Sequence, residues 1–404
     1  MPTSPVTPAP AFPLREKARP AFESGDPALR IVDLFSGCGG LTLGAAQAAS
    51  DAGLALDVRL AVDFEQAAVD VYKANFPKAN AMMASVEDYF DGELADELTE
   101  TELKTRKSVG STHLLFGGPP CQGHSDLNNR TRRDDPKNKL YLKMARAARV
   151  LEPSIVLIEN VPTVRLDTAG VVQTTYDFLK KLGYEVATAT VGMHSLGVAQ
   201  KRRRHVLLAS KVEGIDPELV LRGLASRAED SSFNLEWAIG DLVSLATPAG
   251  YDTPPKASPA NIERMEYMQE SGDLDLPNEK RPKCHQDGNH SYKSMYGRLS
   301  WNDPAQTITS GFGSIGQGRY MHPSALRALT AHEAARIQGF PDYFSFSAAV
   351  KRADLATMIG NAVPPALMRE VGTAVIDLLA LKPGVVDQVE LDPSTTGGEL
   401  ALAR

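Results

Sequence analysis

Short apolar runs that alternate with stretches of helical spacing constrain the fold of this chain more than any other feature. The apolar runs cover residues 30–35, 57–63, 112–118, 154–160 and 205–210. Stretches such as LTLGAAQAA and EQAAVDVYKANF place apolar residues at helical intervals and lie between the first runs. Strands that alternate with helices pair in parallel, because a parallel pair needs a crossover long enough to hold a helix. The alternation therefore predicts an α/β fold built on a parallel sheet.

The same pattern divides the chain into domains. It breaks down after residue 212, where a segment rich in Pro, Gly, Asn and His begins, and helical spacing returns near residue 321. We expect a main domain over residues 30–212, a second, smaller domain over 213–320, and a return to the main domain over 321–382. Prolines at positions 2, 5, 8, 10, 13, 20 and 27 predict a disordered arm over residues 1–29. The acidic segment 383–404 is expected to be a flexible tail.

Composition limits the classes of partner. The net charge of -7 argues mildly against nucleic acid. Basic residues are nevertheless concentrated in residues 130–149, 201–204 and 280–293, and local potential governs phosphate binding. No apolar run reaches membrane-spanning length and the first residues lack a secretory signal pattern, so we expect a cytoplasmic protein without membrane contact. Three cysteines without a CxxC pair fit a reducing compartment.

A glycine-rich loop, DLFSGCGG, follows the first apolar run at the point where a helix begins. Its glycines allow the backbone to approach a ligand closely, although a tight turn of any α/β fold would look the same. Asp63 ends the second run, where a carboxylate accepts hydrogen bonds from ribose hydroxyls. The loop lacks the full GxGxxG pattern and the basic residue of a P-loop. An adenosine ligand without a pyrophosphate therefore fits better than NAD or ATP. Cys38, inside the loop, is expected to contribute packing rather than chemistry.

Cys121 lies in the segment GGPPCQGHS, directly after another apolar run. Ligands bind at the carboxyl ends of strands in sheets of this type. Free cysteines are usually inert core residues, but such a cysteine would have apolar neighbours. Cys121 has Pro, Gln, Gly and His beside it, which indicates a reactive thiol at the edge of a cleft.

Six motifs occur in one order along the chain. They are DLFSGCGG, GGPPCQG, ENV, QKRRRH, LTAHEAARIQGFPDYF and IGNAVPP. Together they closely resemble the motifs of the cytosine-5 DNA methyltransferases, over about residues 31–379. The resemblance implies a Rossmann-like methyltransferase sheet that binds S-adenosylmethionine, a smaller target-recognition domain, and transfer of a methyl group to carbon 5 of cytosine in a specific duplex DNA sequence.

The resemblance also implies catalytic roles. The thiolate of Cys121 would add to carbon 6 of a cytosine that has been flipped out of the duplex, which activates carbon 5. Glu159 would hold the ring at nitrogen 3, and a carboxyl that shares a proton there needs a raised pKa. Alternating residues of a strand point the same way, so Arg202 and Arg204 would act together. One would steady Glu159 and the base, and the other would order the catalytic loop or meet phosphate. Lys201 and Arg203 would face the other side.

The remaining implied site residues follow the family's motifs. The cofactor-binding positions are Asp33, Phe35, Ser36, Gly37, Cys38, Gly39, Gly40, Asp63, Phe64, Ser85, Val86, Pro120, Asn361 and Val363. The DNA and base-pocket positions are Pro119, Gln122, Ser125, Asn160 and Gln200. This chain departs from the family's usual residues at Asp63, where Glu is common, at Ser85, where Asp contacts adenine, and at His124, where Phe is common.

Sequence recognition is expected in the smaller domain. Candidate base readers are Lys280, Arg281, Lys283, His285, Gln286, Asn289, His290, Lys293 and Arg298. Cys284 and two histidines are too few to predict a zinc site, and we expect no metal. The expected partner is double-stranded DNA, bound by a monomer in the cytoplasm at the nucleoid. A cognate restriction enzyme or phage-defence system stays open, as do the alternatives of a transfer-RNA methyltransferase and a non-catalytic DNA-binding homologue.

Overall fold

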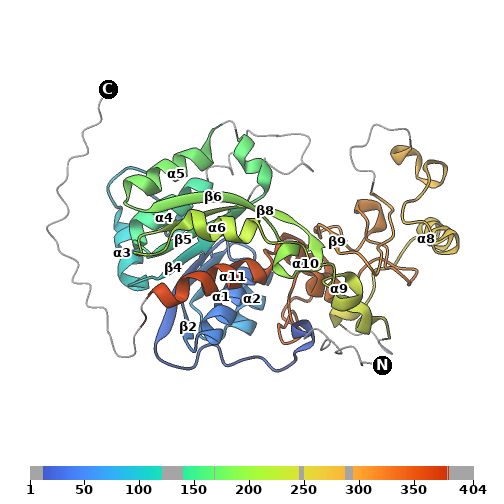
Figure 1. Ribbon diagram of the computed structural model, residues 1–404, viewed down its shortest axis with the longest axis horizontal. Coiled ribbons are helices and arrows are strands. Elements are labelled where there is room, and N and C mark those ends of the chain that lie inside the picture. The colour runs from blue at the N-terminus through green and yellow to red at the C-terminus, as the bar shows by residue number, and fades with distance from the viewer. Residues whose placement is uncertain are drawn as a thin grey trace, which may run out of the picture.

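The computed structural model describes residues 12–120, 140–167, 169–244, 250–286, 294–379 and 381. A seven-stranded sheet lies at the centre of this part of the chain, with the strand order β3-β2-β1-β4-β5-β8-β6 (Figure 1). Its strands are β1 (Ala28–Leu34), β2 (Ala55–Asp63), β3 (Ala81–Met83), β4 (Leu114–Gly117), β5 (Ile155–Asn160), β6 (Glu185–Gly192) and β8 (Arg203–Ser210). The predicted α/β class is confirmed.

Helices cover both faces of the sheet (Figure 1). One face carries α1 (Gly40–Asp51), α2 (Gln66–Asn75), α6 (Pro217–Ala225) and α11 (Pro365–Val375). The other face carries α3 (Glu100–Val109), α4 (Leu140–Leu151) and α5 (Val171–Lys181). Successive residues of β5 alternate between the two cores, with Leu157 in the first and Ile158 in the second. Burial on both sides explains why the central strands are continuous apolar runs.

The orientation of β8 differs from the parallel sheet that the sequence predicts. It pairs antiparallel with both β5 and β6. Residues 193–202, which join β6 to β8, hold only a turn of 3-10 helix and the two-residue strand β7 (Gln200–Lys201). A connection without a crossover helix suits an antiparallel strand. As a result the first residues of β8, which carry arginines, lie beside the carboxyl end of β5, where Asn160 pairs with His205.

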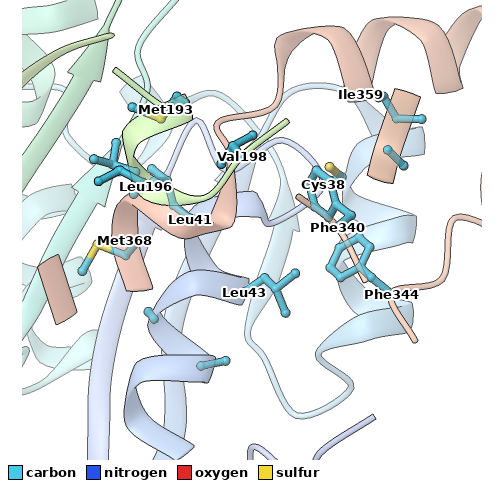
Figure 2. Close-up of a cluster of buried hydrophobic side chains, with 14 of the residues drawn as sticks. Cys38, Leu41, Leu43, Met193, Leu196, Val198, Phe340, Phe344, Ile359 and Met368 are labelled. Carbon is cyan, nitrogen blue, oxygen red and sulfur yellow. The ribbon is translucent and has the colours of Figure 1, made fainter. Parts of the chain in front are cut away.

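The chain returns to the sheet through α9 (Ala331–Ile337), α10 (Arg352–Asn361) and α11. α11 packs directly on α1 because two glycines of α1 leave room for it. A Cβ atom on Gly40 would lie 2.4 Å from the Val363 oxygen, and one on Gly44 would lie 2.1 Å from the Pro365 oxygen. Figure 2 shows side chains of this shared core, among them Leu41, Met193, Phe340, Ile359 and Met368.

A smaller unit with its own core lies beside the main domain, around α8 (Pro259–Ser271) (Figure 1). The core of this unit consists of Met265, Met268, Leu276, Tyr296, Ile315, Met321 and Ala328. By contrast, α6 and α7 (Leu235–Ile239) pack on the main core, so the segment with a separate core begins later than the expected boundary at residue 213. The two-residue strand β9 (Ala305–Gln306) pairs with β7 and joins the two parts.

Residues 12–29 do not form the loose arm that their prolines predict. Leu14 and Phe22 are buried in the main core. The Leu14 oxygen accepts a hydrogen bond from the Asp342 amide at 2.9 Å, and the Phe22 oxygen accepts one from the Leu56 amide at 2.6 Å. Two buried side chains and paired backbone groups hold this segment against the domain, so the expectation is wrong for residues 12–29. Residues 1–11 and the expected tail at 383–404 lie outside the described residues.

Within the described residues, no helix combines the length and the apolar character needed to cross a membrane.

Candidate active site

A cavity of about 1180 Å³ opens where the carboxyl ends of β1, β2, β4 and β5 face the smaller unit. Ligands bind at this edge in sheets of this type. Its wall comes from segments that are far apart in the sequence: residues 33–41, 63–68, 118–120, 159–163, 201–204, 306–310, 317–320 and 360–363 contribute to it. Both the main domain and the smaller unit therefore form the site.

The glycine-rich loop is folded around the carboxylate of Asp63. Asp63 Oδ2 accepts a hydrogen bond from the Gly37 amide at 2.8 Å, and Oδ1 accepts one from the Glu65 amide at 2.9 Å. The turn requires positive φ angles at Phe35 (58°) and Gly37 (52°), a conformation that non-glycine residues seldom adopt. Burial raises the pKa of Asp63, and the amide hydrogen bonds partly offset this. Phe64, with 62% of its surface exposed, lines the cavity beside Asp63.

Asp33 and Cys38 lie deeper in the wall. Asp33 Oδ2 accepts a hydrogen bond from Thr42 Oγ1 at 2.7 Å, and Thr42 Oγ1 is also 2.7 Å from the Tyr72 hydroxyl. Burial raises the pKa of Asp33 to about 8, against the lowering effect of the Thr42 hydrogen bond. Burial also raises the pKa of the Cys38 thiol to about 12, which removes it as a nucleophile. Cys38 lies near Phe340 in the core (Figure 2).

Glu159 and Arg204 form an ion pair on the wall of the cavity. Glu159 is the last but one residue of β5 with 6% of its surface exposed, and Arg204 Nε lies 2.6 Å from its Oε1. Burial raises the pKa of Glu159, while the charges of Arg204 and Arg202 lower it in part. The next residue, Asn160, donates a hydrogen bond from Nδ2 to the Pro119 oxygen at 3.1 Å. This bond ties the end of β5 to the segment that leads to Cys121.

The three polar residues of the Gln-x-Arg-x-Arg pattern have different surroundings. Arg202 is buried and donates from Nη1 to the Ile308 oxygen at 2.9 Å. Gln200 is fully buried, and it does not line the cavity as a base-pocket residue would. Its Nε2 donates to Gln338 Oε1 at 2.8 Å, and its Oε1 accepts from the Ile308 amide at 2.7 Å. Gln200 therefore lies behind the cavity wall and holds Ile308, which lines the cavity.

Other expected cofactor positions divide into two groups. Ser36, Gly40, Pro120, Asn361 and Val363 line the cavity, as do the base-pocket candidates Pro119 and Asn160. Gly39, Ser85 and Val86 do not line it. The Ser85 hydroxyl accepts a hydrogen bond from the Glu87 amide at 3.3 Å and caps a short 3-10 helix. The side chain expected near adenine is therefore already engaged in a local hydrogen bond. Cys121, Gln122, His124 and Ser125 lie outside the described residues.

Two basic residues that the sequence analysis did not place in the site also line the cavity. Lys201 and Arg203 are exposed, line the cavity, and make no ion pair with any residue that the structure describes. Strand alternation predicted that they face away from Glu159, but all four residues from 201 to 204 line the cavity. We find no cluster of His, Cys, Asp or Glu suited to a metal among the described residues.

The candidate base readers are only partly placed. The Arg298 guanidinium is occupied within the smaller unit, because it donates to the oxygens of Gly272, Asp273 and Pro323 at 2.6, 3.1 and 3.0 Å. Arg281 donates from Nε to the Leu276 oxygen at 2.8 Å. These contacts give both arginines a structural role. Asn289, His290 and Lys293 lie outside the described residues.

A model of the C-5 cytosine-specific DNA methylase family matches residues 29–377. The chain belongs to this family. It is a DNA (cytosine-5)-methyltransferase, and the resemblance found in its motifs is confirmed. It is 42% identical over 354 residues to the type II methyltransferase M1.BsuMI of Bacillus subtilis (strain 168), a match that covers 88% of this chain and 82% of the relative. It is 29% identical to the type II methylase M.HgiDII of Herpetosiphon aurantiacus, covering 85% of this chain and 94% of that one.

Solved structures show the same fold. A putative DNA modification methyltransferase encoded within a prophage (E. coli) aligns with 87% of this chain and 99% of its own, at 23% identity and a TM-score of 0.57. The S. pombe Dnmt2 methyltransferase aligns with 87% of this chain and 98% of its own, at 18% identity and a TM-score of 0.57. At these identities the likeness concerns the fold, and it confirms the expected methyltransferase sheet.

Proposed function

We propose that this methyltransferase acts on a cytosine flipped out of duplex DNA, with Cys121 as the nucleophile and S-adenosylmethionine as the methyl donor. The observation that carries the proposal is the buried Glu159–Arg204 pair, which shares one cavity wall with the Asp63 loop and with Pro120, the residue before Cys121. The carboxyl proposed to hold the base, the loop proposed to bind the cofactor and the residue before the proposed nucleophile thus line one cavity.

The residues of the loop fit the proposed donor. Phe64 offers an exposed aromatic face for a flat adenine, and the adjacent Asp63 carboxylate offers acceptors for ribose hydroxyls. Asn361 and Val363 line the same cavity, and the Val363 oxygen lies against Gly40 of the loop. When bound, S-adenosylmethionine supplies an electrophilic methyl group on a sulfonium.

The chain's own residues then activate the base. The Cys121 thiolate adds to carbon 6, and the electron pair that this addition moves to carbon 5 takes the methyl group. Loss of the carbon 5 proton to a base expels the thiolate and restores the ring. Because burial raises its pKa, Glu159 can hold a proton and share it with ring nitrogen 3 while the addition takes place. Arg204 fixes the direction of that carboxyl.

Attack on carbon 6 comes from above the ring plane, so the target must leave the base stack. We propose that the smaller unit around α8 repositions DNA for this step and reads its sequence, and that Lys201 and Arg203 contact backbone phosphates. The relatives named as type II methyltransferases further support a role as the modification enzyme of a restriction–modification or phage-defence system, acting on nucleoid DNA in the cytoplasm.

Covalent trapping tests the proposal. A duplex with 5-fluorocytosine at the target should form a denaturation-resistant adduct in the presence of S-adenosylmethionine. Fluorine takes the place of the carbon 5 proton and cannot be removed by a base, so the thiolate is not released. Cys121→Ser should abolish the adduct, whereas Cys38→Ala, which changes the buried thiol, should retain it. An adduct with Cys121→Ser would reject the nucleophile, and trapping on transfer RNA but not on duplex DNA would reject the substrate.

A further inference from the structure

The main chain of Ile308 is held at both of its polar atoms. Its amide donates to Gln200 Oε1 at 2.7 Å, and its oxygen accepts from Arg202 Nη1 at 2.9 Å. Ile308 is fully buried and lies in the segment that follows β9. Two side chains from the β7 region thus fix the position of this part of the cavity wall.

The same two side chains reach the end of α10. Gln200 donates to Gln338 Oε1 at 2.8 Å, and Gln338 Nε2 donates to the Ile359 oxygen at 2.6 Å. Arg202 Nη1 also lies 3.4 Å from the Gly360 oxygen. We call the side chains of Gln200, Arg202 and Gln338 the buried bridge. Each has 3% or less of its surface exposed.

The two segments joined by the buried bridge also touch directly. A Cβ atom on Gly360 would lie 2.2 Å from the Ser310 amide nitrogen, so the backbones are in close contact. Displacing one segment would leave buried donors and acceptors unpaired, away from water that could replace them. The segments at 308–310 and 359–361 therefore move together or lose several hydrogen bonds.

Each segment belongs to a different binding function. Asn361 and Val363 form the wall assigned to the cofactor. On the other side, the Tyr320 hydroxyl lies 2.9 Å from Thr309 Oγ1 and donates to the Thr307 oxygen at 3.1 Å. Tyr320 precedes Met321, which belongs to the core of the smaller unit. A path of hydrogen bonds and chain neighbours thus runs from Met321 of that unit to the cofactor wall.

We propose that Gln338, together with Gln200, is a positioning residue that couples DNA binding in the smaller unit to cofactor binding at Asn361. The inference rests on the proposed DNA and cofactor sites. DNA that holds residues 307–310 in place would also hold the cofactor wall in its binding conformation. Coupling is reciprocal, so cofactor would tighten DNA binding by the same factor.

Calorimetry with S-adenosylhomocysteine tests this coupling. Its Kd is measured with and without a saturating duplex of the target sequence, using the full-length protein. We expect the duplex to lower the wild-type Kd by a factor between about 5 and 150, the usual range of coupling. Gln338→Met, which keeps the volume and removes the hydrogen bonds, should bring the factor close to 1 while the Kd without DNA stays within about threefold.

Asn75 provides a matched control. Its amide also holds both main-chain polar atoms of one residue, the half-buried Ser345, at 2.8 Å each, but it lies off the path. Asn75→Leu should reduce stability and leave the coupling factor at the wild-type value. If Gln338→Met does not fold, Gln338→Leu removes the same hydrogen bonds with another apolar side chain.

The outcomes separate the inference from the proposed function. Failure of the wild type to bind either S-adenosylhomocysteine or DNA would reject the function itself. Binding of both ligands without coupling, or coupling that persists in a folded Gln338 variant, would overturn the inference. Loss of coupling in the Gln338 variants but not in Asn75→Leu would support it.

Discussion

Arg204 Nε lies 2.6 Å from Glu159 Oε1, and the antiparallel course of β8 brings these two residues together. Glu159 is the last but one residue of β5, and Arg204 is the second residue of β8. A parallel β8 would place its arginines at the opposite edge of the sheet. The direction of one strand therefore decides whether the carboxyl at the cavity has a cationic partner.

Replacing Arg204 should shift the pH dependence of methylation. The charge of Arg204 lowers the pKa of Glu159 against the effect of burial, so Arg204→Met raises that pKa further. If the protonated carboxyl is the active form, the basic limb of the kcat profile moves to higher pH, and kcat itself falls by about 100-fold. Single-turnover methylation between pH 6 and 9 measures both, and Arg203→Met should leave the limb in place. If the basic limb of the pH profile stays in place in Arg204→Met, the limb does not report the titration of Glu159.

Removing the Asp63 carboxylate should weaken cofactor binding. Asp63→Ala takes away the acceptor proposed for the ribose and leaves the amides of Gly37 and Glu65 unpaired. We expect a loss of about 1.5–3 kcal/mol in S-adenosylmethionine binding, the range for a hydrogen bond to a charged group. DNA affinity without cofactor should barely change. Calorimetry measures the loss, and Glu65→Ala is the adjacent acidic control. Equal cofactor affinity in wild type and Asp63→Ala would exclude Asp63 from the site.

The exposed cations of the cavity wall should govern the salt dependence of DNA binding. Each phosphate contact contributes about 0.9 to the slope of log K against log salt. Lys201→Ala and Arg203→Ala should each lower the slope by about that amount and leave cofactor affinity unchanged. Fluorescence anisotropy at several salt concentrations gives the slope. Lys181→Ala, on the exposed side of α5, should not change it. A wild-type slope in both wall variants would contradict phosphate binding there.

Two glycine substitutions of the same chemistry should have opposite effects on stability. Gly44→Ala places a Cβ atom 2.1 Å from the Pro365 oxygen and should destabilise the protein by about 1–3 kcal/mol. Gly223→Ala, at an exposed position of α6 with nothing within 4 Å, should stabilise it by about 0.5–1 kcal/mol. Urea unfolding compares the two. Equal effects would show that α1 and α11 are not in close contact in solution.

Local patterns predicted much of the fold and of the site. Apolar runs and helical spacing gave the strands, and the motif spacing placed Asp63 and Glu159 at strand ends beside one cavity. The resemblance offered Arg202 and Arg204 as partners of Glu159, and Arg204 is the one that forms the ion pair. These features depend on residues close in sequence or on a short motif.

Long-range contacts were not predictable in the same way. Gln200 meets Gln338 and Ile308, which lie more than 100 residues away, so its motif position suggested a pocket residue rather than a buried one. The prolines before residue 29 predicted disorder, because nothing local showed that Leu14 and Phe22 reach the main core. An arginine is a residue type that can recognise a base, but the guanidinium of Arg298 already donates to main-chain oxygens around it.

The contact of α11 with α1 also concerns the order in which the polypeptide is made. The glycine-rich loop and α1 leave the ribosome early, whereas Asn361, Val363 and α11 follow only after the whole smaller unit has been synthesised. A nascent or truncated chain thus has the glycine-rich loop but lacks Asn361 and Val363, which line the same cavity. We expect methylation to begin only after the segment that holds Asn361, Val363 and α11 has been synthesised.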